Sequence, residues 1–217
     1  MPTARPSKEK RRDAERSSRS ILVAAERLFA ERGFDATSLA DIGSGAGLSR
    51  GAPGYFFGSK DALYVEVLEQ VFADRQLATA EAFTSLDRWV EEEEGSLAEA
   101  LTAAVGGYLD FLLRRHAFVR LLQREDLSGT DRLSGASRES QAMTRAFARL
   151  RDLAPSRGVR AFAIDDALML FVSLTFSPLT QRTTFLAALG RDLRDQAVRV
   201  RHVAFVVDQL LHLIADA

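Results

Sequence analysis

A short segment near the N-terminus combines small residues with hydrogen-bond donors that can reach the edges of DNA bases. Arg50 carries the forked donor set that pairs with the two acceptors of guanine in the major groove. The small side chains of Gly51 and Ala52 allow a helix to lie deep in a groove about 12 Å wide. With Ser49 and Tyr55, these residues form a candidate base-reading surface.

A lysine that follows this segment suits a phosphate. Lys60 stands at the expected start of a helix with Ser59 as its cap, and the backbone N–H groups there favour an anion. The glycines of residues 43–47 also suggest a nucleotide loop. No strand precedes them, however, and Gly58-Ser59-Lys60 has the wrong order for a phosphate-binding loop.

Two short helices joined by a glycine turn must position these side chains. The segment from Ser38 to Asp41 has the outline of a capping box, and Gly47 permits a tight bend after the first helix. We predict Ser49 as the cap of the second helix, in which case Pro53 removes only one backbone bond. A helix that begins at Pro53 would instead displace the reading surface.

A longer helix from about Ser17 is predicted to support this pair. Its apolar stripe consists of Ile21, Leu22, Ala25, Leu28 and Phe29. Gly33 then fits a left-handed C-terminal cap. Within the next helix, Gly43 and Gly45 are each expected to weaken the helix by up to ~1 kcal/mol relative to alanine.

The rest of the chain is also helical in pattern, with alternating runs absent. Expected helices begin after Ser59 and Ser96 and cover about 117–126, 137–153, 164–179 and 194–215. Pro178 is expected to kink or end its helix. The prediction is an all-α protein.

Aromatic and large apolar residues of the middle helices are candidates for a small-molecule pocket. Such residues usually pack a core, but together they also suit a cavity between helices. The candidates are Trp89, Tyr108, Phe111, Leu112, Phe118, Leu122, Met143 and Phe147. Gly106 and Gly107 indicate either a cavity or a close helix crossing. We expect an uncharged or weakly polar, partly aromatic effector.

The last helix carries apolar residues on nearly every side and must be covered on two sides. A chain of 217 residues has little material to do this alone, so we predict a homodimer. The expected interface residues are Leu168, Phe171, Val172, Thr175, Val203, Val207, Leu210, Leu211 and Ile214.

Composition excludes several classes of protein. The chain has no cysteine, and no apolar run approaches the ~20 residues that span a bilayer. We expect no membrane partner and a cytoplasmic location.

Residues 1–60 carry 11 basic and 7 acidic side chains, which suits a polyanion at one end or a solvated tail. No catalytic or metal-binding arrangement emerges from the spacing, so we expect neither an enzyme nor a cofactor.

The stretch from Ile21 to Leu63 resembles the tetracycline-repressor (TetR) family. Agreement at fixed spacing involves Ile21, Ala25, Leu28, Phe29, Gly33, Phe34, Thr37, Ser38, Leu39, Asp41, Ile42, Ala46, Gly47, Leu48, Ser49, Arg50, Gly51, Tyr55, Phe57, Ser59, Lys60 and Leu63. The resemblance implies an N-terminal three-helix DNA-binding domain and a larger helical body that binds ligand and dimerises. The expected bounds are 1–15 for a basic flexible arm, 16–62 for the helix-turn-helix domain and 63–217 for the effector-binding and dimerisation domain.

The resemblance also implies roles for individual residues. Thr37 and Ser38 would contact phosphate, Lys60 would clamp another, and the groove would receive Arg50, Gly51, Ala52 and Tyr55. Gly54 departs from the family, which commonly has a phosphate-binding tyrosine there, and Pro53 replaces a common leucine. The implied function is a regulator, in family habit a repressor, that binds a pseudo-palindromic operator in double-stranded DNA and is released by a small molecule. The alternative is a non-specific DNA-binding or structural helical protein without an effector.

Overall fold

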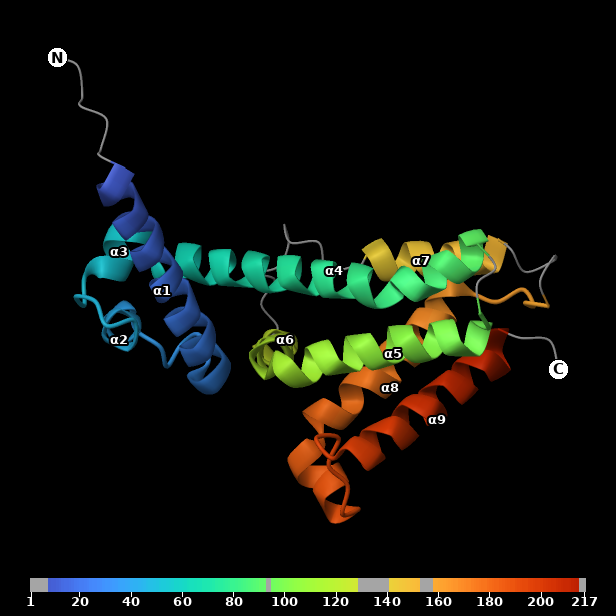
Figure 1. The fold of residues 1–217 in the computed structure, drawn as a ribbon. Coiled ribbons are helices and arrows are strands. Elements are labelled where there is room, and N and C mark those ends of the chain that lie inside the picture. Colours follow the sequence, from blue (N-terminus) through green and yellow to red (C-terminus); the bar gives the residue numbers. More distant parts are fainter. Residues whose placement is uncertain (1–7, 93–94, 129–140, 153–157, 215–217) are drawn as a thin grey trace. The chain divides into compact units, whose positions relative to one another are not determined.

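The computed structural model describes residues 8–92, 95–128, 141–152 and 158–214, and within them regular structure is helical. The helices are α1 (Lys8–Arg32), α2 (Leu39–Gly45), α3 (Ala52–Phe57), α4 (Lys60–Glu92), α5 (Leu97–Arg114), α6 (His116–Ser128), α7 (Gln141–Asp152), α8 (Ile164–Thr180), the π-helix η2 (Arg182–Leu186) and α9 (Gln196–Ile214) (Figure 1). The predicted all-α class is confirmed. None of the described helices has both the length and the apolar character needed to cross a bilayer.

The chain folds into two compact units, each with its own core. Of the described residues, the first unit contains 8–71 and 120–128, that is α1 to α3, the start of α4 and the end of α6. Ile21, Phe29 and Ile42 are fully buried in it. The Phe29 ring meets Tyr64 of α4 edge-on at 4.8 Å between centroids. The three N-terminal helices are therefore held by one small aromatic core.

Local signals place the helix ends of both units. Ser38 and Ser96 each accept a hydrogen bond from the backbone N–H three residues on and complete a capping box with an acidic side chain. Ser59 likewise accepts a bond from the Ala62 N–H at 3.0 Å. Gly33 has a φ of 86°, which is the left-handed conformation expected after α1. The predicted starts of α2, α4 and α5 are confirmed.

The second unit is built on a continuous aromatic core. Its described residues are 72–92, 95–119, 141–152 and 158–214. Helices α5, α8 and α9 lie along one another, and α7 lies against α8 (Figure 1). Phe171 of α8 contacts the rings of Phe83, Tyr108 and Phe147 at 5.3 to 6.1 Å between centroids. Four helices therefore meet at one buried phenylalanine.

The start of α1 differs from the sequence prediction, whereas α8 ends within one residue of its predicted end. Helix α1 begins at Lys8, so residues 8–15 of the expected flexible arm are helical. Charge pairs such as Arg11–Glu15 at 3.6 Å connect successive turns there. Pro178 lies inside α8, which ends two residues later at Thr180 and passes into η2. Residues 129–140, which include the start of the helix expected at 137–153, and residues 153–157 lie outside the described residues.

Candidate nucleic-acid interface

The turn between α2 and α3 depends on a close backbone approach at Gly43. A Cβ at this position would lie 2.5 Å from the carbonyl oxygen of Ser49 and 3.1 Å from the Cα of Arg50. The Gly43 carbonyl accepts the Leu48 N–H at 2.9 Å, which closes the turn. Gly47 makes the bend with a φ of 69°. Gly43 thus has a packing role that its low helix propensity does not indicate.

The start of α3 lies between the two alternatives that the sequence left open. Gly51 is the N-cap and makes no side-chain bond, so the prediction of Ser49 as the cap is wrong. The Ser49 carbonyl instead accepts the Ala52 N–H at 3.0 Å, in a turn before the helix. Pro53 occupies the first turn, where its missing N–H has no helical partner, and it is buried.

The predicted reading residues present a polar and aromatic surface around this helix start. Tyr55 is 86% exposed, and Ser49, Arg50 and Gly51 are exposed as well. Ala52 is half-buried. Arg50 and Gly51 lie in the turn before α3 and not within the helix. The surface that the sequence grouped together is therefore contiguous in the chain and accessible to a ligand.

The first predicted phosphate contact, Thr37, is buried and serves the fold. Its side chain is 1% exposed, and its hydroxyl donates to the Gly33 carbonyl at 2.8 Å. A second carbonyl, that of Leu28, lies 3.3 Å from the same oxygen. A hydroxyl with this little exposure cannot reach a phosphate, so in this structure Thr37 fastens the end of α1 and is not available to DNA.

Replacement of Thr37 by valine tests this structural role. The change keeps the shape but removes the donor from two buried carbonyls, so the free energy of unfolding should fall by about 1–2 kcal/mol. Urea unfolding followed by circular dichroism measures it. The salt dependence of DNA binding should not change. A slope that falls by about one unit would show that Thr37 contacts a phosphate after all.

The second predicted phosphate contact, Ser38, is exposed at the start of α2. Its hydroxyl and backbone N–H both bond to the Asp41 carboxylate, at 2.5 and 3.1 Å. These two bonds lower the pKa of Asp41 below its ordinary value. The capping box fixes the first turn of α2 and holds the Ser38 hydroxyl at the surface.

Lys60 makes an internal contact that the sequence did not indicate. Its ammonium donates to the Phe34 carbonyl at 3.0 Å and lies 4.2 Å from the centre of the Phe34 ring. A lysine ammonium has three donors, so this bond leaves two for another acceptor. Lys60 therefore joins the loop after α1 to the start of α4.

Two side chains of α6 belong to the first unit and were missed by sequence reasoning. The Arg124 guanidinium donates to the carbonyls of Ala30 and Glu31, at 3.1 and 2.8 Å. Glu125 is buried and accepts a bond from the Tyr64 hydroxyl at 2.5 Å. Arg124 is 94 residues from Ala30 in sequence, so no local pattern connects them.

The predicted effector residues belong to the core of the part of the chain that the structure describes. Seven of the eight are buried, and only Leu122 is partly exposed. The Tyr108 ring is tilted against the rings of Phe111 and Phe171, and burial raises the pKa of Tyr108. Gly107 lies against Ala82, where a Cβ would approach the Ala82 Cβ to 3.0 Å. The sequence indicated either a cavity or a close helix crossing at Gly106 and Gly107, and the close crossing is confirmed at Gly107.

One charged residue in this core was not anticipated. Arg75 of α4 is 9% exposed, and its guanidinium lies 5.0 Å from the centre of the Phe72 ring. Burial lowers the pKa of Arg75, which the neighbouring Tyr108 partly offsets. The aromatic region of the second unit therefore contains a cation.

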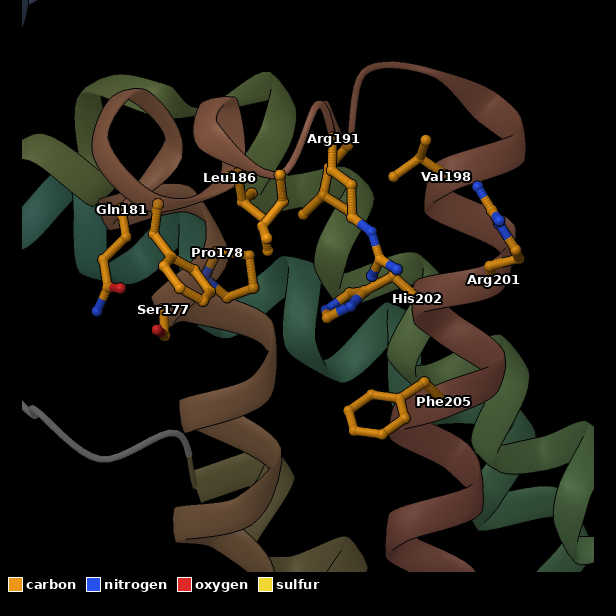
Figure 2. A pocket seen from close by; sticks show the side chains of 12 residues that line it. Ser177, Pro178, Gln181, Leu186, Arg191, Val198, Arg201, His202 and Phe205 are labelled. Atoms are coloured by element: carbon orange, nitrogen blue, oxygen red, sulfur yellow. The ribbon is translucent and has the colours of Figure 1, made fainter.

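A hollow of about 470 Å³ lies elsewhere, where the end of α8, η2 and the first half of α9 meet. Phe185, Leu189 and Phe205 provide apolar walls. Figure 2 shows the Arg191 side chain extending toward the His202 ring of α9. The His202 ring nitrogen lies 2.8 Å from the Leu174 carbonyl of α8. None of the predicted effector residues lines this hollow.

The residues predicted for a dimer interface divide into two sets. Six are buried inside the chain and so cannot provide surface to a partner: Phe171, Thr175, Val203, Val207, Leu210 and Ile214. Val172 is 41% exposed, while Leu168 and Leu211 are half-buried. The exposed apolar residues of α8 and α9 that the prediction omitted are Met169, Val200 and Phe205. Met169 lies one turn before Val172 on α8, so helical spacing places these two residues on one outward face.

Two family models match this chain. Residues 21–67 match the model for bacterial regulatory proteins of the tetR family. Residues 98–210 match the model for the tetracyclin repressor-like C-terminal domain. The first match contains α2 and α3, and the second contains α5 to α8 with most of α9.

Individual relatives extend over nearly the whole chain. The HTH-type transcriptional repressor NicS of Pseudomonas putida is 27% identical over 203 residues, which cover 91% of this chain and 92% of NicS. A tetR-family regulator from Mesorhizobium loti has a TM-score of 0.70 at 19% identity, covering 94% of this chain and 98% of its own. A tetR-family protein from Rhodococcus RHA1 has a TM-score of 0.67 at 18% identity, covering 93% and 98%. These two structures share the fold of this chain.

Proposed function

Because this chain belongs to the tetR family of bacterial regulatory proteins, we propose that it is a repressor that binds a pseudo-palindromic DNA operator as a homodimer. The observation that carries the proposal is the exposed set of Arg50, Gly51 and Tyr55 at the start of α3, held out by the Gly43 turn. Its relative NicS is a transcriptional repressor, which supports repression here.

Selection of DNA fragments from a random pool tests the function, and Arg50→Ala tests the reading residue. The purified protein should enrich one two-fold symmetric sequence and bind it ~10³-fold or more tightly than random duplex. Arg50→Ala should cost about 1–3 kcal/mol at one base pair of each half-site and relax the preference there. Fluorescence anisotropy with operator duplexes that differ at single positions measures both. Unchanged base preference would show that Arg50 touches only phosphate.

We propose that Lys60 binds a phosphate with the two donors not used by Phe34. Lys60→Ala should then weaken binding to operator and random duplexes alike and reduce the salt slope by about one unit. The same change removes the bond to the Phe34 carbonyl and should also lower the free energy of unfolding. Lys60→Arg, which keeps the charge, is the control. If Lys60→Ala lowers stability without changing the salt slope, the lysine is structural only.

The homodimer is proposed to form along the outward faces of α8 and α9. Met169 and Val172 on α8 and Val200 and Phe205 on α9 are between 41 and 70% exposed, which is unusual for apolar residues on adjacent helices. A two-fold interface uses the same patch on both copies, so its charges must complement themselves.

The charge pattern of α9 meets this condition. Arg201 and Asp208 are exposed and stand symmetrically on either side of Ala204 and Phe205. If two copies of α9 cross antiparallel at these central residues, Arg201 of each copy faces Asp208 of the other. Arg201 makes no ion pair with any residue that the structure describes, so its charge is available to a second copy.

A small planar effector is proposed to bind in the aromatic region of the second unit and to release the DNA. The support is the cluster of Phe83, Tyr108 and Phe147 around Phe171, an apolar region of tilted and edge-on rings that suits a partly aromatic ligand. Thermal unfolding with a library of aromatic compounds tests it, since a ligand at 100 times its Kd stabilises the protein by about 2.7 kcal/mol.

The alternative to the whole proposal is a non-specific DNA-binding protein without an effector. That alternative predicts no enriched sequence and no stabilising compound.

A further inference from the structure

The outer face of α1 carries a row of arginines that extends from the N-terminal end of the helix toward α2. Because an α-helix repeats every ~3.6 residues, Arg12, Arg16, Arg19 and Arg27 fall within one face, with the exposed Val23 between them. We call these four arginines the α1 basic ridge. From Arg12 to Arg27 the ridge is about 22 Å long at ~1.5 Å per residue.

The first turns of α1 have no role in the core of their unit. All side chains described from Glu9 to Arg16 are exposed, and the first buried residue is Ile21. About three turns of helix therefore continue past the apolar core. A stretch of this kind gains nothing from burial, and its helical form depends on charge pairs such as Arg16–Asp13 at 3.6 Å.

The ridge adjoins the helix pair that carries the reading surface. A hollow of about 350 Å³ between α1 and the end of α2 is lined by Arg19 and Arg27 on one side and by Gly45 and Ala46 on the other. Gly45 and Ala46 lead directly into the turn before α3. Figure 1 shows α3 next to α1, and the two helices are in contact. The ridge thus borders the end of α2, which leads into the reading surface.

The arginines of the ridge have few ion-pair partners among the described residues. Arg12 and Arg19 form no ion pair with any described residue, and Arg16 and Arg27 have only exposed partners at 3.6 Å. Exposed pairs of this kind are worth at most about 1 kcal/mol and are easily exchanged for another anion. Glu9 and Glu26 also lie at the edges of the face, beside the pairing carboxylates Asp13 and Glu31.

We propose that the α1 basic ridge binds the phosphate backbone of the DNA that flanks the site read by α3. This inference rests on the proposed function and adds a second, sequence-independent contact surface to it. A row of exposed cations about 22 Å long can contact several phosphates along a strand, whereas the compact surface around Arg50 suits base edges. The ridge should contribute affinity and salt dependence but no base preference.

The test compares two double variants with the same change of charge on the same exposed helix. Arg12→Ala/Arg19→Ala removes two ridge arginines. Lys10→Ala/Arg11→Ala removes two cations from other faces of α1, since Lys10 and Arg11 lie outside the ridge. Both pairs lie outside the core, and circular dichroism checks that α1 remains helical. Binding to a random-sequence 40-base-pair duplex and to the selected operator is followed by anisotropy between about 50 and 300 mM salt.

The ridge variant should lose about 10- to 30-fold in affinity near 150 mM salt for both duplexes, and its salt slope should fall by about two units. The off-ridge variant should change either quantity far less. Equal losses in the two variants would mean that the α1 charge acts diffusely, and the ridge would be refuted. No loss in the ridge variant would refute it as well. If Arg50→Ala still alters base preference in either case, the regulator function stands and only the ridge fails.

Discussion

Gly43→Ala is expected to separate α2 from α3 and to reduce operator affinity by at least about 10-fold. The new methyl group would lie 2.5 Å from the Ser49 carbonyl oxygen, which belongs to the backbone and cannot rotate away. The two helices must move apart, and the Leu48–Gly43 bond that closes the turn must lengthen. Overpacking of this kind costs about 1–3 kcal/mol. Urea unfolding and anisotropy with the selected operator measure the two effects.

Gly45→Ala is the matched control for this prediction. A Cβ at Gly45 would meet the end of the Arg27 side chain at 3.3 Å, and that side chain is flexible. Alanine should therefore stabilise the same helix by up to ~1 kcal/mol through its higher helix propensity. DNA binding should remain intact. If both alanines behaved alike, propensity alone would govern the positions and the close approach at Gly43 would be unimportant.

Arg201→Glu is expected to convert the proposed homodimer to a monomer at low micromolar concentration. In the antiparallel crossing of α9, the change places a glutamate opposite Asp208 at two symmetric positions. Like charges facing each other at an interface cost several kcal/mol. The dissociation constant should rise by about 100-fold or more, which corresponds to ~2.7 kcal/mol. Sedimentation velocity over a concentration series measures it.

A charge reversal in the same chain makes this prediction specific for the register. Arg201→Glu combined with Asp208→Arg should restore the dimer, because each new glutamate then faces a new arginine of the other copy. Arg145→Glu on the exposed face of α7 makes the same change of charge away from α9 and should leave the dimer intact. Failure of the double variant to dimerise, with its fold intact, would exclude the crossing at Ala204 and Phe205.

The helix order and the caps could be predicted because their signals are local. The capping serines Ser38 and Ser96 mark the starts of their helices, and the apolar spacing identifies α9 and the part of α1 from about Ser17 onward. The reading surface followed from the same local pattern. The prediction of the N-cap of α3 was wrong. Gly51 is the N-cap in place of the expected Ser49, and Pro53 is buried in the first turn.

Contacts between distant segments could not be predicted from one sequence. The local sequence does not distinguish Thr37 from a surface threonine. Its burial follows from the contacts of its hydroxyl with the carbonyls of Leu28 and Gly33. Helix propensity alone marks Gly43 as a weak helix residue, and only the fold reveals the close approach of the Ser49 carbonyl. The buried and exposed sides of α8 and α9 were similarly confused. Both sides are apolar, so hydrophobicity alone did not separate Phe171, which is buried, from Met169, which is exposed.

The contribution of α6 to the first unit has a consequence for domain exchange within this family. A fragment that stops in α4 would lack Arg124, the donor for the last carbonyls of α1, and Glu125, the acceptor for Tyr64. Transplanting the N-terminal reader onto another regulator therefore requires residues 120–128, or a matching arginine and glutamate in the recipient. The unit that we propose to choose the operator is therefore discontinuous in the sequence.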